Sequence, residues 1–249
     1  MKLENLERWR YYMKERSSPN SFIDWGFYYM MAASLQRRVW VGAEGAELFP
    51  NIYVVLVSDP GIGKGLVIDP VSDMLAYHKE ERINVNKGIQ PDVNADEINE
   101  MMMDASEQRY NPHLSSKIQN EKRLLLPKAP DAITFEALVS STAEAIRYIS
   151  YKDADGKTKI YSHSSIYFSL EEISSLFRKH TEDTVNFLMR AYVCKDYKYK
   201  TKTQGEASIK RCCLNLLGGT QPHFIQKLFG DELLTDFRSF ISLRYLRNN

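Results

Sequence analysis

Residues 58–66 have the types and spacing of a phosphate-binding turn. The segment reads Ser58-Asp59-Pro60-Gly61-Ile62-Gly63-Lys64-Gly65-Leu66. Glycines at 61 and 63 allow successive backbone N–H groups to point at phosphate oxygens, and a following helix adds the positive end of its dipole. Lys64 can then bridge the β- and γ-phosphates of a nucleotide.

The flanking sequence favours phosphate binding over an ordinary glycine-proline turn. Residues 51–57 form a near-continuous apolar run rich in β-branched side chains, which is typical of a parallel strand covered on both faces. Residues 66–77 have the apolar spacing of a helix. Strand, glycine-rich turn and helix is the order of a P-loop, so we predict that Asp59 to Leu66 bind the phosphates of ATP.

The turn departs from the strict P-loop pattern at two positions. Ser58 stands at the first glycine position, and Gly65 stands where a Ser or Thr normally ligates Mg²⁺. Leu66 cannot replace that hydroxyl. Mg²⁺ would therefore depend on water and on acidic residues elsewhere, and turnover is expected to be slow.

A pair of carboxylates, Glu171-Glu172, follows a second apolar run at residues 166–170. The carboxyl edge of a parallel nucleotide-binding sheet faces the phosphates. We assign Glu171 to the Mg²⁺ shell and Glu172 to the attacking water. Taken alone, such a pair is more often the solvated first turn of a helix.

A third apolar run, residues 212–217, ends in Gly218-Gly219-Thr220-Gln221-Pro222. If this strand lies between the other two, a polar side chain at its tip can touch the γ-phosphate or its water. Thr220 is the first candidate for this role, with Asn215 and Gln221 behind it. A capping Thr in a glycine-proline turn is an equally weighted alternative.

A basic stretch at residues 195–211 alternates lysine with tyrosine and threonine. Alternation places Lys198, Lys200 and Lys202 on one face of a strand, with Gly205 as a candidate hairpin tip. A basic, aromatic hairpin can follow a nucleic-acid backbone. The alternative is an edge strand that its lysines protect from further pairing.

The remaining pattern predicts an α/β fold with a central, mostly parallel sheet flanked by helices. Helical spacing is seen at residues 3–13, 21–35, 134–150, 173–179, 183–192 and 223–229, and a last strand at 240–246. Residues 22–35 are aromatic nearly all round, which suits a helix that is buried or covered by another subunit. We expect an N-terminal helical segment over 1–48 and a P-loop core over 49–249, with a polar insertion at about 80–128.

Composition excludes several classes of protein. The chain has 249 residues, 43% of them hydrophobic, and 33 basic against 32 acidic residues, so a globally basic nucleic-acid binder is excluded. The three cysteines have no metal-ligand spacing, which indicates reduced thiols in a cytoplasm. No apolar stretch approaches the ~20 residues of a membrane span, so no membrane partner is expected.

The order of these motifs resembles the P-loop ATPase domain of phage and plasmid replication proteins of the primase-helicase type. That group is related to viral superfamily-three helicases and more distantly to AAA+ ATPases. The resemblance runs from Ser18 to Tyr245. The segments that carry it are Ser18-Pro19 and residues 36–41, 49–64, 133–138, 171–172 and 216–222.

The resemblance implies an ATP- and Mg²⁺-dependent motor on single-stranded or forked DNA, which works as a homo-oligomeric ring with other replication proteins. Phosphate contacts would come from Gly63 and Lys64, and the basic hairpin would face the central channel. In a ring, an arginine from one subunit completes the neighbour's site. The family often has Phe-x-Ser-Arg near its end, whereas this chain reads Phe237-Arg238-Ser239-Phe240. Arg238 and Arg244 are therefore only candidates, and no primase domain is expected.

Two other functions remain open at this point. The departures at Ser58, Gly65 and Phe240 all concern hydrolysis, so the chain could bind nucleotide as a weakly hydrolysing or non-hydrolysing helicase loader. Such a loader would recruit a partner through the aromatic residues 22–31. A small-molecule phosphotransferase is indicated only by Gly-Lys-Gly, and no arginine-rich lid supports it.

Overall fold

The computed structural model describes residues 4–43, 46–85, 126–131, 134–152, 155–177, 181–201, 205–229 and 241–245. Among them lies a five-stranded sheet with the order β4-β5-β8-β3-β9. Parallel pairing joins β3 (Tyr53–Val57) to β8 (Cys213–Thr220) and to β9 (Ile241–Tyr245), and β8 to the second half of β5 (Thr158–Leu170). β4 (Ile146–Lys152) is antiparallel to β5. The fold is therefore α/β with a mixed, mostly parallel sheet.

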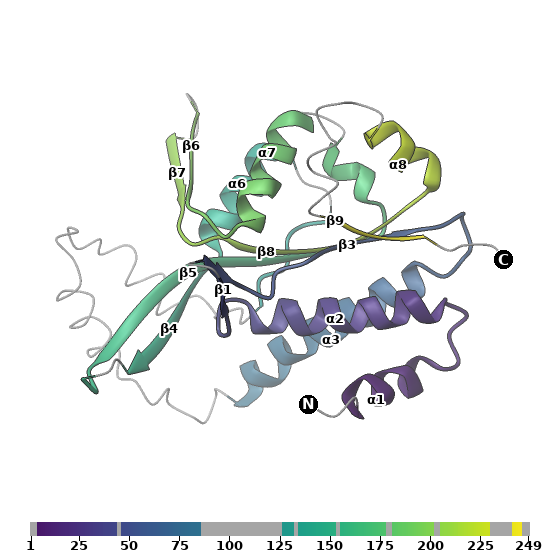
Figure 1. The fold of residues 1–249 in the computed structure, drawn as a ribbon, viewed down its shortest axis with the longest axis horizontal. Helices are drawn as coiled ribbons and strands as arrows, with labels where there is room; N and C mark the ends of the chain where they lie inside the picture. Colours follow the sequence, from purple (N-terminus) through teal and green to yellow (C-terminus); the bar gives the residue numbers. More distant parts are fainter. Residues whose placement is uncertain are drawn as a thin grey trace.

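Helices cover both faces of the sheet (Figure 1). One face carries α2 (Asn20–Leu35) and α3 (Gly65–Val85), and the other carries α6 (Phe135–Glu144), α7 (Thr181–Tyr192) and α8 (Pro222–Phe229). Alternate residues of β3 enter two separate cores: Val55 packs on the α6 and α7 side, and Leu56 on the α2 and α3 side. This double coverage explains why β3 and β8 are buried at every position and mostly apolar.

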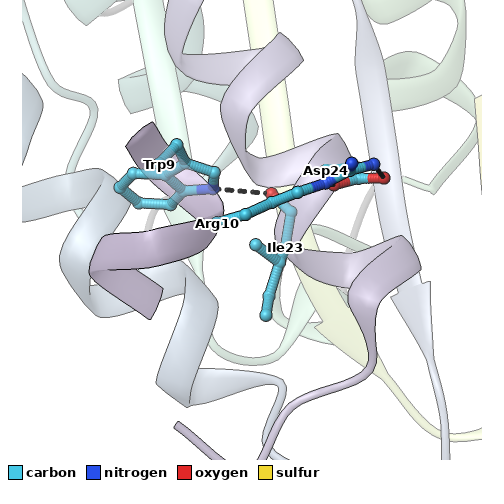
Figure 2. A network of polar contacts seen from close by, with 4 residues as sticks. All are labelled: Trp9, Arg10, Ile23 and Asp24. Atoms are coloured by element: carbon cyan, nitrogen blue, oxygen red, sulfur yellow. Dashed lines mark hydrogen bonds and ion pairs between the residues drawn. The ribbon is translucent and has the colours of Figure 1, made fainter. Parts of the chain in front are cut away.

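The N-terminal helix α1 (Glu4–Met13) is fastened to α2 by two contacts (Figure 2). The indole N–H of Trp9 donates to the carbonyl of Ile23 at 2.8 Å. Arg10 forms two hydrogen bonds to the Asp24 carboxylate, at 2.7 and 2.6 Å. A buried indole and a bidentate arginine pair together fix the angle between the helices.

The aromatic helix α2 is buried within this chain. Phe22 and Tyr29 have no exposed surface, and Phe27 is 8% exposed. The Tyr29 hydroxyl donates a hydrogen bond to the carbonyl of Phe168 in β5. Of the two sequence-based alternatives, a buried helix or one covered by another subunit, the first is confirmed.

Two small hairpins stand outside the main sheet. β1 (Val41–Ala43) pairs with β2 (Ala46–Leu48). β6 (Tyr197–Thr201) pairs with β7 (Gly205–Ile209). Gly205 lies opposite Thr201 as the first residue of β7, so it is not the hairpin tip.

The observed structure differs most from the sequence-based prediction in the region after α6. The Thr134 hydroxyl caps the helix by accepting from the Ala137 N–H at 3.3 Å, as predicted, but the helix ends at Glu144 and not near residue 150. Residues 146–152 instead pair with residues 158–164 of β5, and this pairing overrides the helical spacing. A short 3₁₀-helix, η1 (Ile173–Phe177), replaces the helix expected at 173–179. Most of the polar insertion, residues 86–125, lies outside the described residues.

Two further expectations concern cysteines and membranes. Cys194, Cys212 and Cys213 are free thiols, and the latter two are buried. Among the described helices, none combines the length and apolarity that a membrane crossing requires.

The packing of α2 on α3 leads to a stability prediction at Gly26. A Cβ there would lie 2.6 Å from Cγ1 of Val67, so Gly26→Ala should lower the free energy of unfolding by about 1–3 kcal/mol. Without that contact the same change would raise stability, because alanine is the better helix former by about 1 kcal/mol. Urea unfolding of the variant and of the unchanged chain shows whether the free energy of unfolding falls or rises.

Gly42→Ala is the matched control, because a Cβ at that position meets nothing within 4 Å. Adding Val67→Ala to Gly26→Ala should recover part of the loss, since it removes the clashing methyl group. A stabilised Gly26→Ala variant would contradict this packing.

Candidate functional site

Three predicted site segments meet at the carboxyl edge of the sheet. β3, β5 and β8 are parallel, and β8 lies between the other two, as the sequence predicted. Val57 pairs with Thr220 across one side of β8, and Leu170 pairs with Gly218 across the other. The turn after β3 and the acidic pair after β5 therefore flank the end of β8.

The turn after β3 has the backbone of a phosphate cradle. Gly61 and Gly63 adopt φ values of +84° and +78°, which favour glycine. A Cβ on Gly63 would lie 2.4 Å from the backbone oxygen of Ser17, so the link between α1 and α2 closes the back of the turn. α3 begins at Gly65, and its first free N–H groups point toward this turn.

The amine of Lys64 folds back over the turn. Its Nζ donates to the carbonyls of Ser58 and Asp59 at 2.7 and 3.0 Å, and to the Ser58 hydroxyl at 3.0 Å. Burial lowers the pKa of Lys64, while the charges of Glu172 and Asp59 act in the opposite direction. Ser58, which stands where the strict P-loop pattern has glycine, thus provides one more oxygen to the lysine, and the motif alone does not predict this contact.

The second glutamate of the acidic pair is held in place by the predicted threonine. The fully buried Thr220 donates its hydroxyl proton to Oε1 of Glu172 at 2.8 Å. The same Oε1 accepts from the Ser174 N–H at 3.2 Å. Glu172 remains exposed to solvent, so its carboxylate is both oriented and accessible.

Gly218 and Gly219 belong to β8 and are not a turn, contrary to the sequence-based interpretation. A Cβ on Gly219 would lie 2.6 Å from the backbone oxygen of Glu171 and 3.3 Å from Cδ of Lys64. A Cβ on Gly218 would lie 3.0 Å from Ile173. The glycines therefore allow the lysine stem and the acidic loop to approach the same strand end, and a Gly-Gly pair ending a buried strand is the signal that could have shown it.

The missing hydroxyl at Gly65 leaves few protein ligands for a metal ion. The atom nearest to a Cβ at this position is Oδ2 of Asp69, at 3.9 Å. Among the described residues, no group of three or more His, Cys, Asp or Glu side chains could hold a metal ion. Mg²⁺ does not require such a group, because it typically takes one or two carboxylates and completes its shell with phosphates and water.

Of the remaining predicted residues, Gln221 and Arg244 lie near this edge and Asn215 does not. Asn215 is at the other end of the strands, where its Oδ1 accepts from the Ile52 N–H at 2.9 Å, and this contact is structural. Gln221 lies between β8 and α8. Arg244 is in β9, opposite Leu56 in register. Lys202 and Arg238 lie outside the described residues.

The basic hairpin has the alternation that the sequence predicted. Tyr197 packs on Phe187 with ring centroids 4.9 Å apart, and Tyr199 packs on Phe135 at 5.2 Å. Lys198 and Lys200 are exposed. β7 leads into the amino end of β8, so the hairpin lies at the end of the sheet away from the phosphate turn (Figure 1).

No family model and no curated protein sequence matches this chain.

The environment of Lys64 can be measured by its reactivity. Because burial lowers its pKa, the amine loses its proton at a lower pH than a free lysine does. We expect Lys64 to reach half-maximal acetylation at a lower pH than N-acetyl-lysine amide in the same tube. Mass spectrometry of the Lys64 peptide gives the midpoint, and a midpoint at or above that of the standard would contradict the geometry.

Proposed function

We propose that the protein is a P-loop ATPase that works on nucleic acid during replication, in the manner of the phage and plasmid replication ATPases that its motifs resemble. It would work in a cytoplasm, as a homo-oligomeric ring on single-stranded or forked DNA, with other replication proteins. The observation that carries the proposal is the meeting of Lys64, Glu172 and Thr220, from three separate segments, at one strand end.

The strand order supports the same proposal. β8, which ends in Thr220, separates the P-loop strand β3 from the acidic strand β5, and β9 flanks β3 on its other side. A third strand in this position can place its last side chain between the phosphates and the acidic pair. A threonine that only capped the turn would not be expected to form a hydrogen bond with a carboxylate 48 residues away in the sequence.

The chain's own residues suggest how hydrolysis would proceed. The backbone N–H groups of residues 61–65 bind the phosphate oxygens, and Lys64 exchanges its carbonyl partners for the β- and γ-phosphates. Glu172, oriented by Thr220, accepts a hydrogen bond from the attacking water and directs it at the γ-phosphorus. Glu171 and the phosphates would hold Mg²⁺, which neutralises charge that develops on the phosphate oxygens.

The first test is ATP turnover by the purified chain with Mg²⁺, beside a Lys64→Ala variant. We expect turnover to fall at least about 100-fold in the variant, because it lacks the positively charged donor that stabilises the charge developing on the phosphate oxygens. Lys14→Ala is the control, since that exposed lysine lies directly after α1 and contacts Tyr11. Equal turnover in Lys64→Ala and the unchanged chain would refute an ATPase at this site.

The helicase-loader alternative is favoured by one observation, the absence of a hydroxyl at Gly65. Its partner-recruiting helix is less favoured, because Phe22 and Phe27 of α2 are buried within the chain. Under this alternative the unchanged chain binds ATP without turnover. Gly65→Ser would then start hydrolysis by supplying the missing metal ligand.

The β6–β7 hairpin leads to a separate prediction about the stimulation of ATP turnover by DNA. Replacing Lys198 and Lys200 by Gln should abolish stimulation of turnover by single-stranded DNA and leave basal turnover unchanged, because both side chains are exposed and far from the phosphate turn. Tyr197 and Tyr199 still anchor the hairpin in this variant.

A charge-matched control replaces Arg8 of α1 and Lys14, which directly follows α1, by Gln. Stimulation should be unchanged in this control. Stimulation that survives in the hairpin variant would show that the lysines only protect an edge. The assay compares ATP turnover with and without a poly-dT oligonucleotide.

A further inference from the structure

Two cysteines lie on either side of the β6–β7 hairpin. Cys194 lies between α7 and β6, and Cys213 is the first residue of β8, which follows β7. β6 and β7 pair in antiparallel fashion, and at the base of the hairpin Oδ1 of Asp196 accepts from the Arg211 N–H at 2.8 Å. The chain that enters the hairpin and the chain that leaves it are therefore fastened together next to both cysteines.

The thiols of Cys194 and Cys213 are in contact. Cys213 donates a hydrogen bond to the sulfur of Cys194. Cys194 Sγ in turn donates to Oδ1 of Asn51 at 3.4 Å. Asn51 is held by the hydrogen bond that its Nδ2 donates to the carbonyl of Tyr192 at 2.6 Å. Two sulfurs and an amide oxygen thus join the start of β8, the end of α7 and the residues that lead into β3.

The backbone at Cys194 is held in an uncommon conformation. Its φ is +54°, in the left-handed region that residues other than glycine rarely adopt. Its N–H donates to the carbonyl of Ala191 at 3.1 Å, and its carbonyl accepts from Nη1 of Arg37 at 3.4 Å. Such a conformation persists only where the surrounding contacts fix it, so the place of the Cys194 side chain is determined by the fold.

The three thiols differ in their access to solvent and in their acidity. Cys194 is partly exposed, whereas Cys212 and Cys213 have no exposed surface. The hydrogen bond from Cys213 lowers the pKa of Cys194 and the charge of Arg37 acts in the same direction, although burial opposes both. The same hydrogen bond, together with burial, raises the pKa of Cys213. Because the thiolate is the reactive form, Cys194 is the thiol that a reagent from solvent meets first.

We propose that Cys194 and Cys213 form a reversible disulfide that closes the β6–β7 hairpin at its base, with a hydroperoxide as the oxidant. In the first step the Cys194 thiolate attacks one oxygen of hydrogen peroxide and the O–O bond breaks. Hydroxide leaves and takes up the proton that the thiol has lost, so one water is released and Cys194 becomes a sulfenic acid.

The buried thiol completes the reaction. The Cys213 sulfur attacks the sulfur of the Cys194 sulfenic acid, the S–O bond breaks, and the oxygen leaves as a second water with the proton of Cys213. The two sulfurs lose two electrons in all, and these reduce one peroxide to two waters. A dithiol reverses the reaction by thiol–disulfide exchange and is itself oxidised to a disulfide.

The disulfide would enclose residues 195–212, which contain the whole hairpin with its exposed Lys198 and Lys200. It would also tie the end of α7 to the start of β8. A cross-link that closes such a loop restricts the unfolded chain, so oxidation should make the folded chain more stable. Neither ATP nor nucleic acid takes part, and this inference therefore stands apart from the proposed ATPase.

The experiment treats the folded chain with hydrogen peroxide, blocks the remaining thiols with iodoacetamide and identifies tryptic peptides by mass spectrometry. We expect residues 191–195 to be joined to residues 212–227, and dithiothreitol to separate them. Cys212 and Cys213 share the second peptide, so Cys212→Ala is the matched control and should give the same link.

The partner of Cys194 is tested by Cys213→Ala. This variant should lose the link and leave Cys194 as a sulfenic acid, which dimedone should label at least about tenfold more than in the unchanged chain. A link that survives in Cys213→Ala would overturn the proposal, because Cys212 would then be the partner.

Urea unfolding keeps the test valid if Cys213→Ala does not fold. The unfolding midpoint of the unchanged chain should rise on oxidation, and that of Cys194→Ser should not. Serine is tolerated at this partly exposed position, since its hydroxyl can also donate to Asn51. The proposal is overturned if the link forms only in urea-unfolded chain. It is also overturned if peroxide oxidises Cys194 to a sulfinic acid in the unchanged chain without any link to residues 212–227.

Discussion

The parallel pairing of β8 with β3 and β5 is the constraint on which the candidate site depends. Backbone hydrogen bonds set this register, and they place Val57 beside Thr220 and Leu170 beside Gly218. The phosphate turn and the acidic loop are thereby brought to the two sides of one strand end. A slip of one residue would turn Thr220 to the opposite face of the sheet and break its bond to Glu172.

α2 provides the second constraint, because it lies beneath the sheet from one end to the other. At its start, the backbone of Ser17 closes the turn at Gly63. In its middle, Gly26 allows contact with Val67, and the Tyr29 hydroxyl bonds to Phe168. The N-terminal segment therefore packs as part of the core, and α1 is secured to it through Trp9 and Arg10.

The sequence was informative where one short segment carries its own pattern. The apolar run before the phosphate turn, the alternation around Lys198 and the cap at Thr134 are all local signals, and each predicted its element. It failed in two kinds of place. β4 and the first half of β5 form a local hairpin within residues 146–164, and their pairing overrides the helical spacing that the sequence shows there. The arginines whose charges act on the buried His163 come from segments spread over residues 37–211, so no window of sequence contains them. The Gly219 contact with Lys64 was missed for the same reason.

β8 connects the two ends of the molecule. It ends in Thr220, begins next to Arg211 and the hairpin, and is buried at all eight of its residues. Parallel neighbours pair with it on both sides over its length of about 25 Å. A rigid strand transmits a displacement but does not create two states. On the proposed function, those states come from the hydrogen bond between Thr220 and Glu172, which can be kept or lost as the charge beside it changes on hydrolysis. On the proposed function, this arrangement would place nucleotide and nucleic acid at opposite ends of one strand, and not in a single cleft.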